Sequence, residues 1–320
     1  MLTSDRIEPA SKCTEQLFIL GAPRSGTTFL ASLLGSTRFG KPVESHFVAK
    51  YFLGLNNYGN LDNEANFNRL LTDILRERPI KQWRLILNSS QLHRELLEQK
   101  GHIRYADLVE SLFLARQKAT NRNAWGDKTP HYLGDVDILD ELFPKARYIY
   151  IVRDGRDVAM SLLQKEWGPN NIYTAAEYWV RLNQSSDTLT RLASTGRLHF
   201  LRYEDLSQSL EHHIQEIGLF LGEVFSEDEV SSLAGTVRKD NSFKWKHSLP
   251  LHKVRLFESV GRETLARFGY EAGKSQSPIP SYQRIFYRWH DKALWAVFMF
   301  KVNVIHGLQI RFFGREPFAD

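Results

Sequence analysis

Glycine, arginine and hydroxyl side chains gather in residues 21–28 (GAPRSGTT), a combination that suits the binding of a phosphate group. The stretch follows the apolar run 17–20 and precedes an apolar helical segment that ends near Leu34. At such a strand–turn–helix junction, successive backbone N–H groups point at one spot and the start of the helix adds partial positive charge. Gly26 lets the backbone approach an oxyanion closely. The residues expected to hold the anion are Arg24, Ser25, Gly26, Thr27 and Thr28.

The same stretch differs from the phosphate-binding loop of nucleoside triphosphatases, G-x-x-x-x-G-K-[ST]. Gly21, Gly26 and Thr28 take the corresponding places, but Thr27 replaces the lysine that reaches the β- and γ-phosphates. The fixed cation is Arg24, inside the turn. The turn therefore suits a single phosphate group. The alternatives are a P-loop kinase that uses a nucleoside triphosphate and an ordinary turn with an exposed arginine.

A second cationic segment follows the apolar run 147–152. Arg153 stands at its carboxyl end, where open α/β sheets collect ligands, and Ser161 follows eight residues later on a predicted helix over 157–164. Arg153 offers a forked, charge-assisted contact and Ser161 a hydroxyl, so the two together suit a second phosphate. In the alternative interpretation, Asp157 caps this helix. It would then belong to a surface ion-pair cluster made by Arg153, Asp154, Arg156 and Asp157.

Three strand-like apolar runs, 17–20, 147–152 and 198–203, each precede a segment with helical periodicity. This alternation is typical of parallel βαβ units and predicts the α/β class. Between the first two runs lies a mostly helical insertion at about 50–120, which we expect to wall a substrate cleft. Its predicted helices cover 63–76, 91–100 and 105–119.

Composition limits the classes of function. The 320 residues, of which 42% are hydrophobic, suit one large α/β domain, and a formal charge of +5 is too small to indicate nucleic-acid binding. The chain has one cysteine, Cys13, so we expect neither an intrachain disulfide framework nor a cysteine metal cluster. Residues 1–12 are polar and unlike a signal peptide, and no run of about 18 apolar residues occurs. We therefore expect a cytoplasmic protein.

Residues 23–28 (PRSGTT) and the R-x(7)-S unit of Arg153 and Ser161 resemble, as a pair, the motifs of sulfotransferases that use 3′-phosphoadenosine 5′-phosphosulfate (PAPS). In that family the first motif holds the 5′-phosphosulfate and the second holds the 3′-phosphate. The resemblance extends from Leu17 to about Tyr270. It implies a P-loop-kinase-like parallel sheet flanked by helices and a sulfotransferase domain over 1–272. It also implies PAPS as the sulfuryl donor, 3′-phosphoadenosine 5′-phosphate (PAP) as the product, and no metal.

Three smaller features agree with this resemblance. Residues 201–206 (LRYEDL) are similar to a strand end of the family whose tyrosine, here Tyr203, lies near the adenine. Residues 265–270 (LARFGY) are similar to the end of the domain in bacterial members. Residues 241–247 (NSFKWKH) stand where the family has a basic loop that closes over the nucleotide, with the candidate contacts Lys244, Trp245 and Lys246. A core tyrosine, a helix end and solvated lysines are the ordinary alternatives.

The resemblance also suggests catalytic residues. Glu44 follows Arg24 by 20 residues, a spacing similar to the tyrosylprotein sulfotransferase branch, which uses a glutamate there as the base. His46 and His131 are alternatives, because cytosolic members that act on small molecules use histidine. Lys128, on a defined loop at 125–130 (WGDKTP), is the expected second cation at the leaving oxygen. Arg24 can neutralise charge but not donate a proton, so any proton donation falls to Lys128.

These features together predict the in-line transfer of a sulfuryl group to a hydroxyl acceptor, for which the protein supplies a base and cations. By analogy with the family, carbohydrate or glycolipid acceptors are favoured over small alcohols and peptide tyrosines. The alternatives are a P-loop kinase and a non-catalytic nucleotide-binding module. The presence of both Glu44 and Lys128 argues against the second.

The C-terminal segment 273–320 is predicted to be a helical extension rich in aromatic and basic residues. It is joined to the domain through 273–282 (GKSQSPIPSY), whose composition favours irregular chain. Trp295, Phe298, Val302 and Ile305 recur at helical spacing and define an apolar face. This helix either packs on the domain or contacts a membrane surface or a second copy of the chain.

Overall fold

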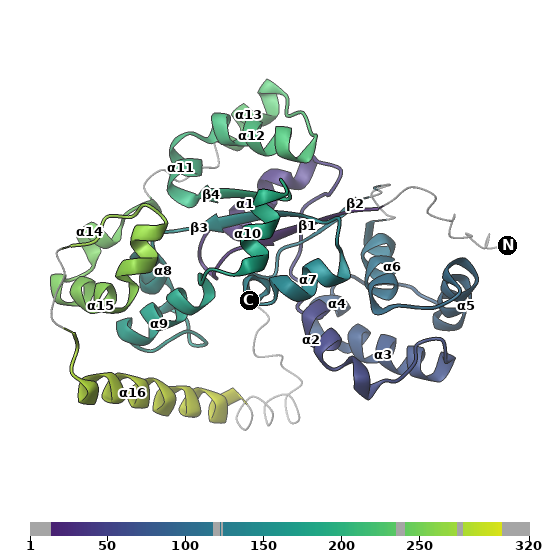
Figure 1. The fold of residues 1–320 in the computed structure, drawn as a ribbon, viewed down its shortest axis with the longest axis horizontal. Coiled ribbons are helices and arrows are strands. Elements are labelled where there is room, and N and C mark those ends of the chain that lie inside the picture. The colour runs from purple at the N-terminus through teal and green to yellow at the C-terminus, as the bar shows by residue number, and fades with distance from the viewer. Residues whose placement is uncertain (1–13, 118–121, 123, 235–240, 274–277, 303–320) are drawn as a thin grey trace.

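Four parallel strands form the sheet at the centre of the protein, in the order β2-β1-β3-β4 (Figure 1). The structure, a computed structural model, describes residues 14–117, 122, 124–234, 241–273 and 278–302. Residues 1–12, Cys13 and Ile305, which entered the sequence analysis, lie outside these ranges. The predicted α/β class with a parallel sheet is confirmed. The strands are β1 Glu15–Leu20, β2 Ala124–Asp127, β3 Arg147–Val152 and β4 Leu198–Arg202.

β1 and β3 are the buried middle strands, and both were predicted. Helices cover both of their faces, so the two strands read as continuous apolar runs rather than as alternating ones. β2 was not predicted, since its sequence, AWGD, contains Gly126 and Asp127 and forms no apolar run. It pairs in parallel with β1 from Ala124 to Asp127, where a loop was expected. Lys128 consequently stands directly at the end of a strand.

The helical insertion packs on one face of the sheet. It shares one hydrophobic core with Phe18 and Tyr148 of the strands. Trp125 of β2 stacks on Phe113 of the insertion with ring centroids 4.1 Å apart. The three predicted helices of the insertion are confirmed as α3, α5 and α6, with described ends that differ from the predicted ones by at most two residues. Residues 118–119 of the third predicted helix lie outside the described ranges, and α2 and α4 were not predicted. The bounds are α2 Val48–Leu53, α3 Glu64–Arg76, α4 Arg78–Lys81, α5 Ser89–Lys100 and α6 Tyr105–Gln117.

Further helices cover the other face and the end of the sheet (Figure 1). α1 Thr27–Leu33 and α12 Leu210–Leu221 pack with Ile19 and Ile151 on the face opposite the insertion. α8 Gly155–Leu162 follows β3 and packs with α9 Ile172–Leu182 and α15 Leu251–Arg267. The remaining helices are α7 Val136–Leu142, α10 Asp187–Ser194, α11 Tyr203–Gln208, α13 Glu227–Ala234, α14 Trp245–Ser248 and α16 Ser281–Phe300, with 3₁₀ turns at Leu34–Ser36, Leu55–Asn57 and Pro130–Leu133.

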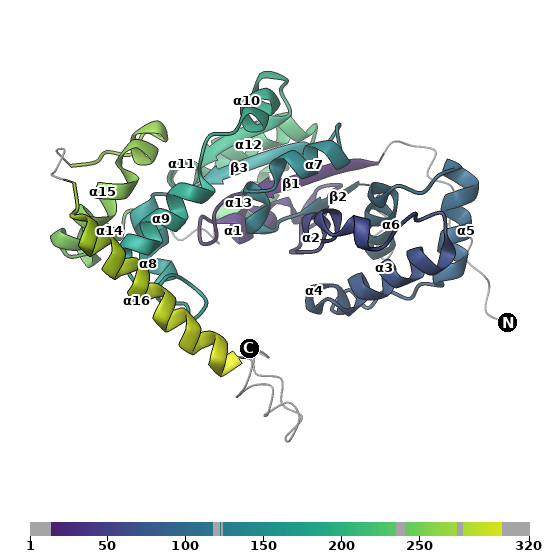
Figure 2. The ribbon, with the colours of Figure 1, turned by 60° about the horizontal axis from the view of Figure 1, so that its bottom comes forward.

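α16 runs along the outside of the layer formed by α8, α9 and α15 (Figures 1 and 2). The predicted helix is confirmed, but none of its residues is buried. Trp295 of the predicted apolar face is 51% exposed, while Phe298 and Val302 are partly covered. Within the described ranges, no helix combines the length and the apolar character needed to cross a membrane.

Arg156 joins three segments of the α8 layer through buried contacts. Its guanidinium donates to Asp154 at 2.8 and 2.9 Å and to Glu258 of α15 at 2.8 Å. It also stacks on the indole of Trp245, 3.6 Å from the ring centroid. Arg153 also pairs with Asp157, so the ion pairs of the alternative interpretation exist, but a surface position is wrong because these side chains are at most 9% exposed. Asp154 rather than Asp157 caps α8, by accepting a hydrogen bond from the Arg156 N–H.

Replacing Arg156 by alanine should destabilise the fold by about 3–5 kcal/mol, because two buried carboxylates would lose their cation. The free energy of unfolding, measured by urea denaturation, tests this expectation. The matched control is Arg191→Ala, which removes an arginine paired with Asp140 but 57% exposed. The control should cost no more than about 1 kcal/mol. Equal, small losses in both variants would contradict the structural role assigned to Arg156.

Candidate active site

The turn between β1 and α1 has the backbone geometry of an anion site. Gly26 has φ +96° and Arg24 has φ +72°, so both residues lie in the left-handed region. The side chain of Ser25 is fully buried, and its Oγ has no hydrogen-bond partner within the described residues. Such an unpaired hydroxyl in a buried position is uncommon and indicates a ligand contact. The turn therefore presents a hydroxyl and backbone N–H groups to one location.

Tyr203 lies directly against this turn. A Cβ added to Gly26 would stand 2.4 Å from the Tyr203 ring, so only glycine fits at this approach. The phenol oxygen accepts a hydrogen bond from Asn241 Nδ2 at 3.0 Å. The guanidinium of Arg153 lies 4.6 Å from the ring centroid. Tyr203 thus connects the first cationic segment with the second.

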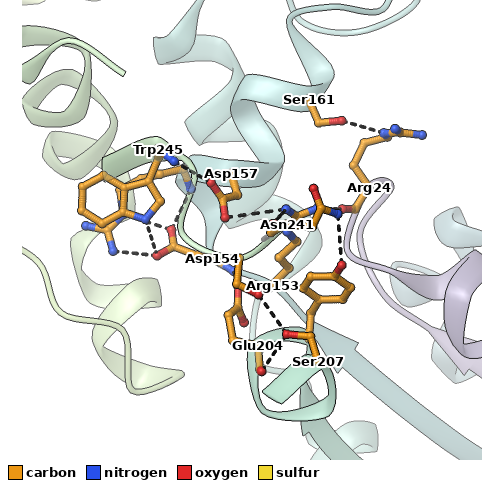
Figure 3. Close-up of polar contacts among 12 residues, drawn as sticks. Arg24, Arg153, Asp154, Asp157, Ser161, Glu204, Ser207, Asn241 and Trp245 are labelled. Carbon is orange, nitrogen blue, oxygen red and sulfur yellow. Dashed lines mark hydrogen bonds and ion pairs between the residues drawn. The ribbon is translucent and has the colours of Figure 1, made fainter. Parts of the chain in front are cut away.

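Arg153 and Arg24 lie next to each other (Figure 3). Arg153 Nη1 donates to the backbone oxygen of Arg24 at 3.3 Å, and Nη2 donates to the backbone oxygen of Asn241. Arg24 Nε in turn donates to Ser161 Oγ at 2.8 Å. Arg153 is 7% exposed, and its Nε has no partner among the residues that the structure describes. The two motifs that were far apart in the sequence therefore form one cationic surface.

Buried acids hold the segment that carries Arg153. Glu204, next to Tyr203, accepts from the Asp154 N–H at 3.0 Å and from the Tyr270 hydroxyl at 2.6 Å. Burial raises the pKa of Glu204, and the two donors oppose that effect. Glu204, in the segment 201–206, and Tyr270, in the segment 265–270, thereby help to position Asp154, which follows Arg153.

The three candidate residues of the predicted basic loop differ in their contacts and exposure. The Trp245 N–H donates to Asp157 Oδ1 at 2.8 Å, and its indole N–H donates to Asp154 Oδ2 at 3.0 Å (Figure 3). Trp245 is therefore engaged in packing the α8 layer. Lys244 and Lys246 are exposed, and the ammonium of Lys246 lies 5.0 Å from the Phe243 ring centroid. A nucleotide contact by these three residues stays a prediction.

Lys128 connects the phosphate-binding turn with Glu44. Its Nζ donates to Thr28 Oγ1 at 3.1 Å and to the carboxylate of Glu44. The side chain of Lys128 is 7% exposed and that of Glu44 is 42% exposed, so the carboxylate remains accessible. Hydrogen bonds from His46 and Lys128 lower the pKa of Glu44 to about 2 against the opposing effect of burial. Glu44 is therefore ionised at neutral pH.

The two histidines considered as alternative bases lie beside Glu44. His46 Nε2 is 3.2 Å from Glu44 Oε2, and the rings of His46 and His131 are 6.3 Å apart. Burial, with His46 nearby, lowers the pKa of His131. The three candidates therefore form one group at the end of β2.

A buried network positions Glu44 and Lys128. Asp127 accepts hydrogen bonds from the hydroxyls of Ser45 and Thr129. Thr129 Oγ1 also accepts from the Ser45 N–H at 3.0 Å, and the Tyr132 hydroxyl lies 2.9 Å from Ser45 Oγ. Burial raises the pKa of Asp127 to about 7. Because Ser45 follows Glu44 and Asp127 precedes Lys128, this network brings the two candidate catalytic side chains together.

The sequence analysis missed this network and the supporting role of Glu204. Asp127 and Thr129 flank Lys128 in the WGDKTP stretch, so two polar side chains on either side of the candidate lysine were an available signal. Ser45 carried no comparable signal, because its partners are 82 and 87 residues away in the chain.

A cleft of about 850 Å³ opens beside Glu44, Lys128 and Thr28. Residues of the core domain and of the helical insertion both line this cleft. Trp83 supplies an aromatic surface, and Arg116 stacks on it, 5.6 Å from the ring centroid. Its basic lining residues are Lys41, His46, Arg78, Arg116, Arg122 and Lys128.

One group of potential metal ligands occurs within the described residues. His212, His213 and Glu216 of α12 have ligand atoms within 4.8 Å of one another. The sequence analysis had found no such cluster. His213 Nδ1 is 2.8 Å from Glu216 Oε2. These residues do not line the cleft described above, and a metal-free reaction stays a prediction.

Comparisons with known proteins show the family of the chain. The sequence profile of the sulfotransferase family matches residues 16–227, more than half of the chain. The nodulation protein NoeE of Sinorhizobium fredii is 25% identical over 327 residues, which cover 86% of this chain and 73% of that protein.

Solved sulfotransferase domains have a similar fold. The sulfotransferase domain of the Synechococcus PCC 7002 olefin synthase matches with a TM-score of 0.51 at 22% identity, over 81% of this chain and 96% of that chain. The sulfotransferase domain from the curacin biosynthetic pathway gives a TM-score of 0.49 at 19% identity, over 82% and 100% of the two chains. The match to the olefin synthase domain supports the expected P-loop-kinase-like fold. From the family profile, the chain belongs to the sulfotransferase family.

Proposed function

We propose that the chain transfers a sulfuryl group from PAPS to the hydroxyl group of an acceptor bound in the cleft. The observation that carries this proposal is the position of Lys128. Its ammonium contacts Thr28 of the phosphate-binding turn on one side and the accessible carboxylate of Glu44 on the other. A cation between an anion site and a base is the arrangement that in-line transfer between two oxygens requires.

The nucleotide would lie across the cationic surface shared by the two motifs. The turn residues Ser25 to Thr28 would hold the 5′-phosphosulfate, with the unpaired Ser25 hydroxyl as one donor. Arg153 and Ser161 would hold the 3′-phosphate, and the unpaired Nε of Arg153 provides a charge-assisted hydrogen bond. Arg24, joined to Ser161 in the structure, lies between these two groups. Tyr203 offers a ring next to both.

The transfer step forms a bond between the acceptor oxygen and sulfur while the bond from sulfur to the phosphate oxygen of PAP breaks. Glu44 accepts the hydroxyl proton, and Lys128 and Arg24 neutralise charge on the leaving phosphate. In the structure, Lys128 and His46 weaken Glu44 as a base by lowering its pKa. Movement of Lys128 towards the sulfuryl group would remove one of these cations, so the proton affinity of Glu44 would rise when the donor binds.

The size and the lining residues of the cleft suit a carbohydrate or glycolipid acceptor. Its volume of about 850 Å³ exceeds the needs of a small alcohol. Polar and basic side chains supply hydrogen bonds for several hydroxyl groups, while Trp83 offers an apolar face for a sugar ring. The kinase alternative is disfavoured, because Thr27 stands in place of the lysine and is 4% exposed.

Calorimetry with PAP and with ATP and magnesium tests the donor class. We expect PAP to bind at least about tenfold more tightly, since each phosphate meets its own charge-assisted donors. Magnesium-dependent binding of ATP that is tighter than PAP binding would indicate a kinase instead.

Arg153→Ala should weaken PAP binding about 10- to 100-fold, because it removes a buried, charge-assisted contact to phosphate. Calorimetric titration measures this change. Arg94→Ala is the matched control, since Arg94 is exposed on α5 outside the proposed site. PAP affinity that is equal in the two variants would exclude Arg153 from the nucleotide site.

Glu44→Gln should lower turnover with labelled PAPS by about 10²- to 10⁴-fold, the usual effect of losing a general base. PAP affinity should change little, because Glu44 is not among the proposed phosphate contacts. Parallel assays of His46→Gln and His131→Gln serve as controls. A larger loss in either histidine variant, with Glu44→Gln still active, would transfer the role of base to that histidine.

A further inference from the structure

The outward side of α16 carries a continuous row of apolar side chains. Positions three and four apart share one side of a helix, which relates Tyr282 to Phe286, Trp289 to Ala293, and Val297 to Phe300. The large members of this row are strongly exposed, at 70% for Tyr282, 67% for Ile285, 57% for Phe286, 65% for Trp289, 65% for Val297 and 62% for Phe300. Monomeric soluble proteins seldom expose so many large apolar side chains together.

The inward side of α16 is attached to the domain by mainly polar contacts. Asp291 accepts a hydrogen bond from the Asn170 N–H at 2.6 Å. Arg288 pairs with Glu177 of α9, and Tyr287 stacks on Tyr173. These contacts hold the side of α16 that carries Tyr287 and Asp291 against the domain, so the apolar row lies on the other side of the helix. The usual arrangement of an amphipathic helix, with its apolar side on the domain, is therefore reversed.

The charged and aromatic side chains of α16 indicate which kind of partner covers its apolar row. Lys292 is exposed three residues after Trp289 of the row, while Asp291, the acidic residue of this helix, is engaged by Asn170 on the inward side. Tryptophan and tyrosine favour the boundary between water and hydrocarbon, and basic side chains favour anionic lipid headgroups. A helix of 20 residues is about 30 Å long, so it can lie along a membrane with its whole apolar row inserted.

We infer that α16 is a peripheral membrane anchor that lies in the surface of an anionic bilayer. Its outward row, Tyr282 to Phe300, enters the headgroup boundary, while Lys292, three residues after Trp289, contacts the headgroups. This inference is independent of the sulfuryl-transfer reaction. It places the domain at a lipid surface.

Sedimentation of the full chain with vesicles tests the anchor. We expect binding to vesicles of phosphatidylcholine with about 30% phosphatidylglycerol, and weaker binding to phosphatidylcholine alone or at high salt. The double variant Phe286→Asp/Trp289→Asp should lower the partition coefficient by at least about tenfold, because carboxylates replace two inserted apolar side chains.

The matched control is Leu219→Asp/Val224→Asp. It makes the same charge change at side chains that are 84% and 94% exposed and lie outside α16. This control should retain at least about half of the wild-type binding. Thermal unfolding checks that both variants are folded. The inference is overturned if the wild-type chain stays in the supernatant with anionic vesicles, or if the two variants bind equally. A dimer in analytical ultracentrifugation that only the α16 variant abolishes, without vesicle binding, would assign the row to a second copy.

Discussion

Hydrogen bonds to the buried carboxyl group of Asp127 keep the two halves of the site together. Asp127 ends β2, and its partners Ser45 and Thr129 belong to the loop after α1 and to the segment after β2. Leaving a buried polar group unpaired costs about 1–3 kcal/mol, so the loop and the strand end are held in one arrangement. Glu44 and Lys128, which are next to these residues in sequence, take their positions from that constraint.

Most of the sheet could be predicted because burial on both faces leaves a clear pattern. β3 was located at both ends, and β1 begins two residues earlier than expected. The third predicted strand ends at Arg202 rather than Tyr203, which begins α11 instead. β2 could not be found from hydrophobicity. Its one large apolar residue, Trp125, stands between small or polar residues, although it packs in the core and the strand pairs with β1.

The candidate site was predictable where a local motif carries the function, and less so where distant residues meet. The phosphate-binding turn and Arg153 belong to recognisable segments, and the structure brings them together. The alternative interpretation gave the cap of α8 to Asp157 instead of Asp154, because both acids stand near the helix start and only packing with Arg156 and Glu204 distinguishes them. The position of Trp245 was equally unpredictable, since its partners Asp157 and Asp154 are 88 and 91 residues away in the chain.

The backbone of Arg24 is strained, while its side chain supplies the positive charge of the turn. A non-glycine residue in the left-handed region costs about 1–2 kcal/mol, and Arg24 adopts φ +72°. Glycine would relieve that strain and leave the turn without its guanidinium. The turn thus combines a strained backbone at Arg24 with a permanent positive charge. Variants selected for heat resistance alone would tend to lose this arginine first.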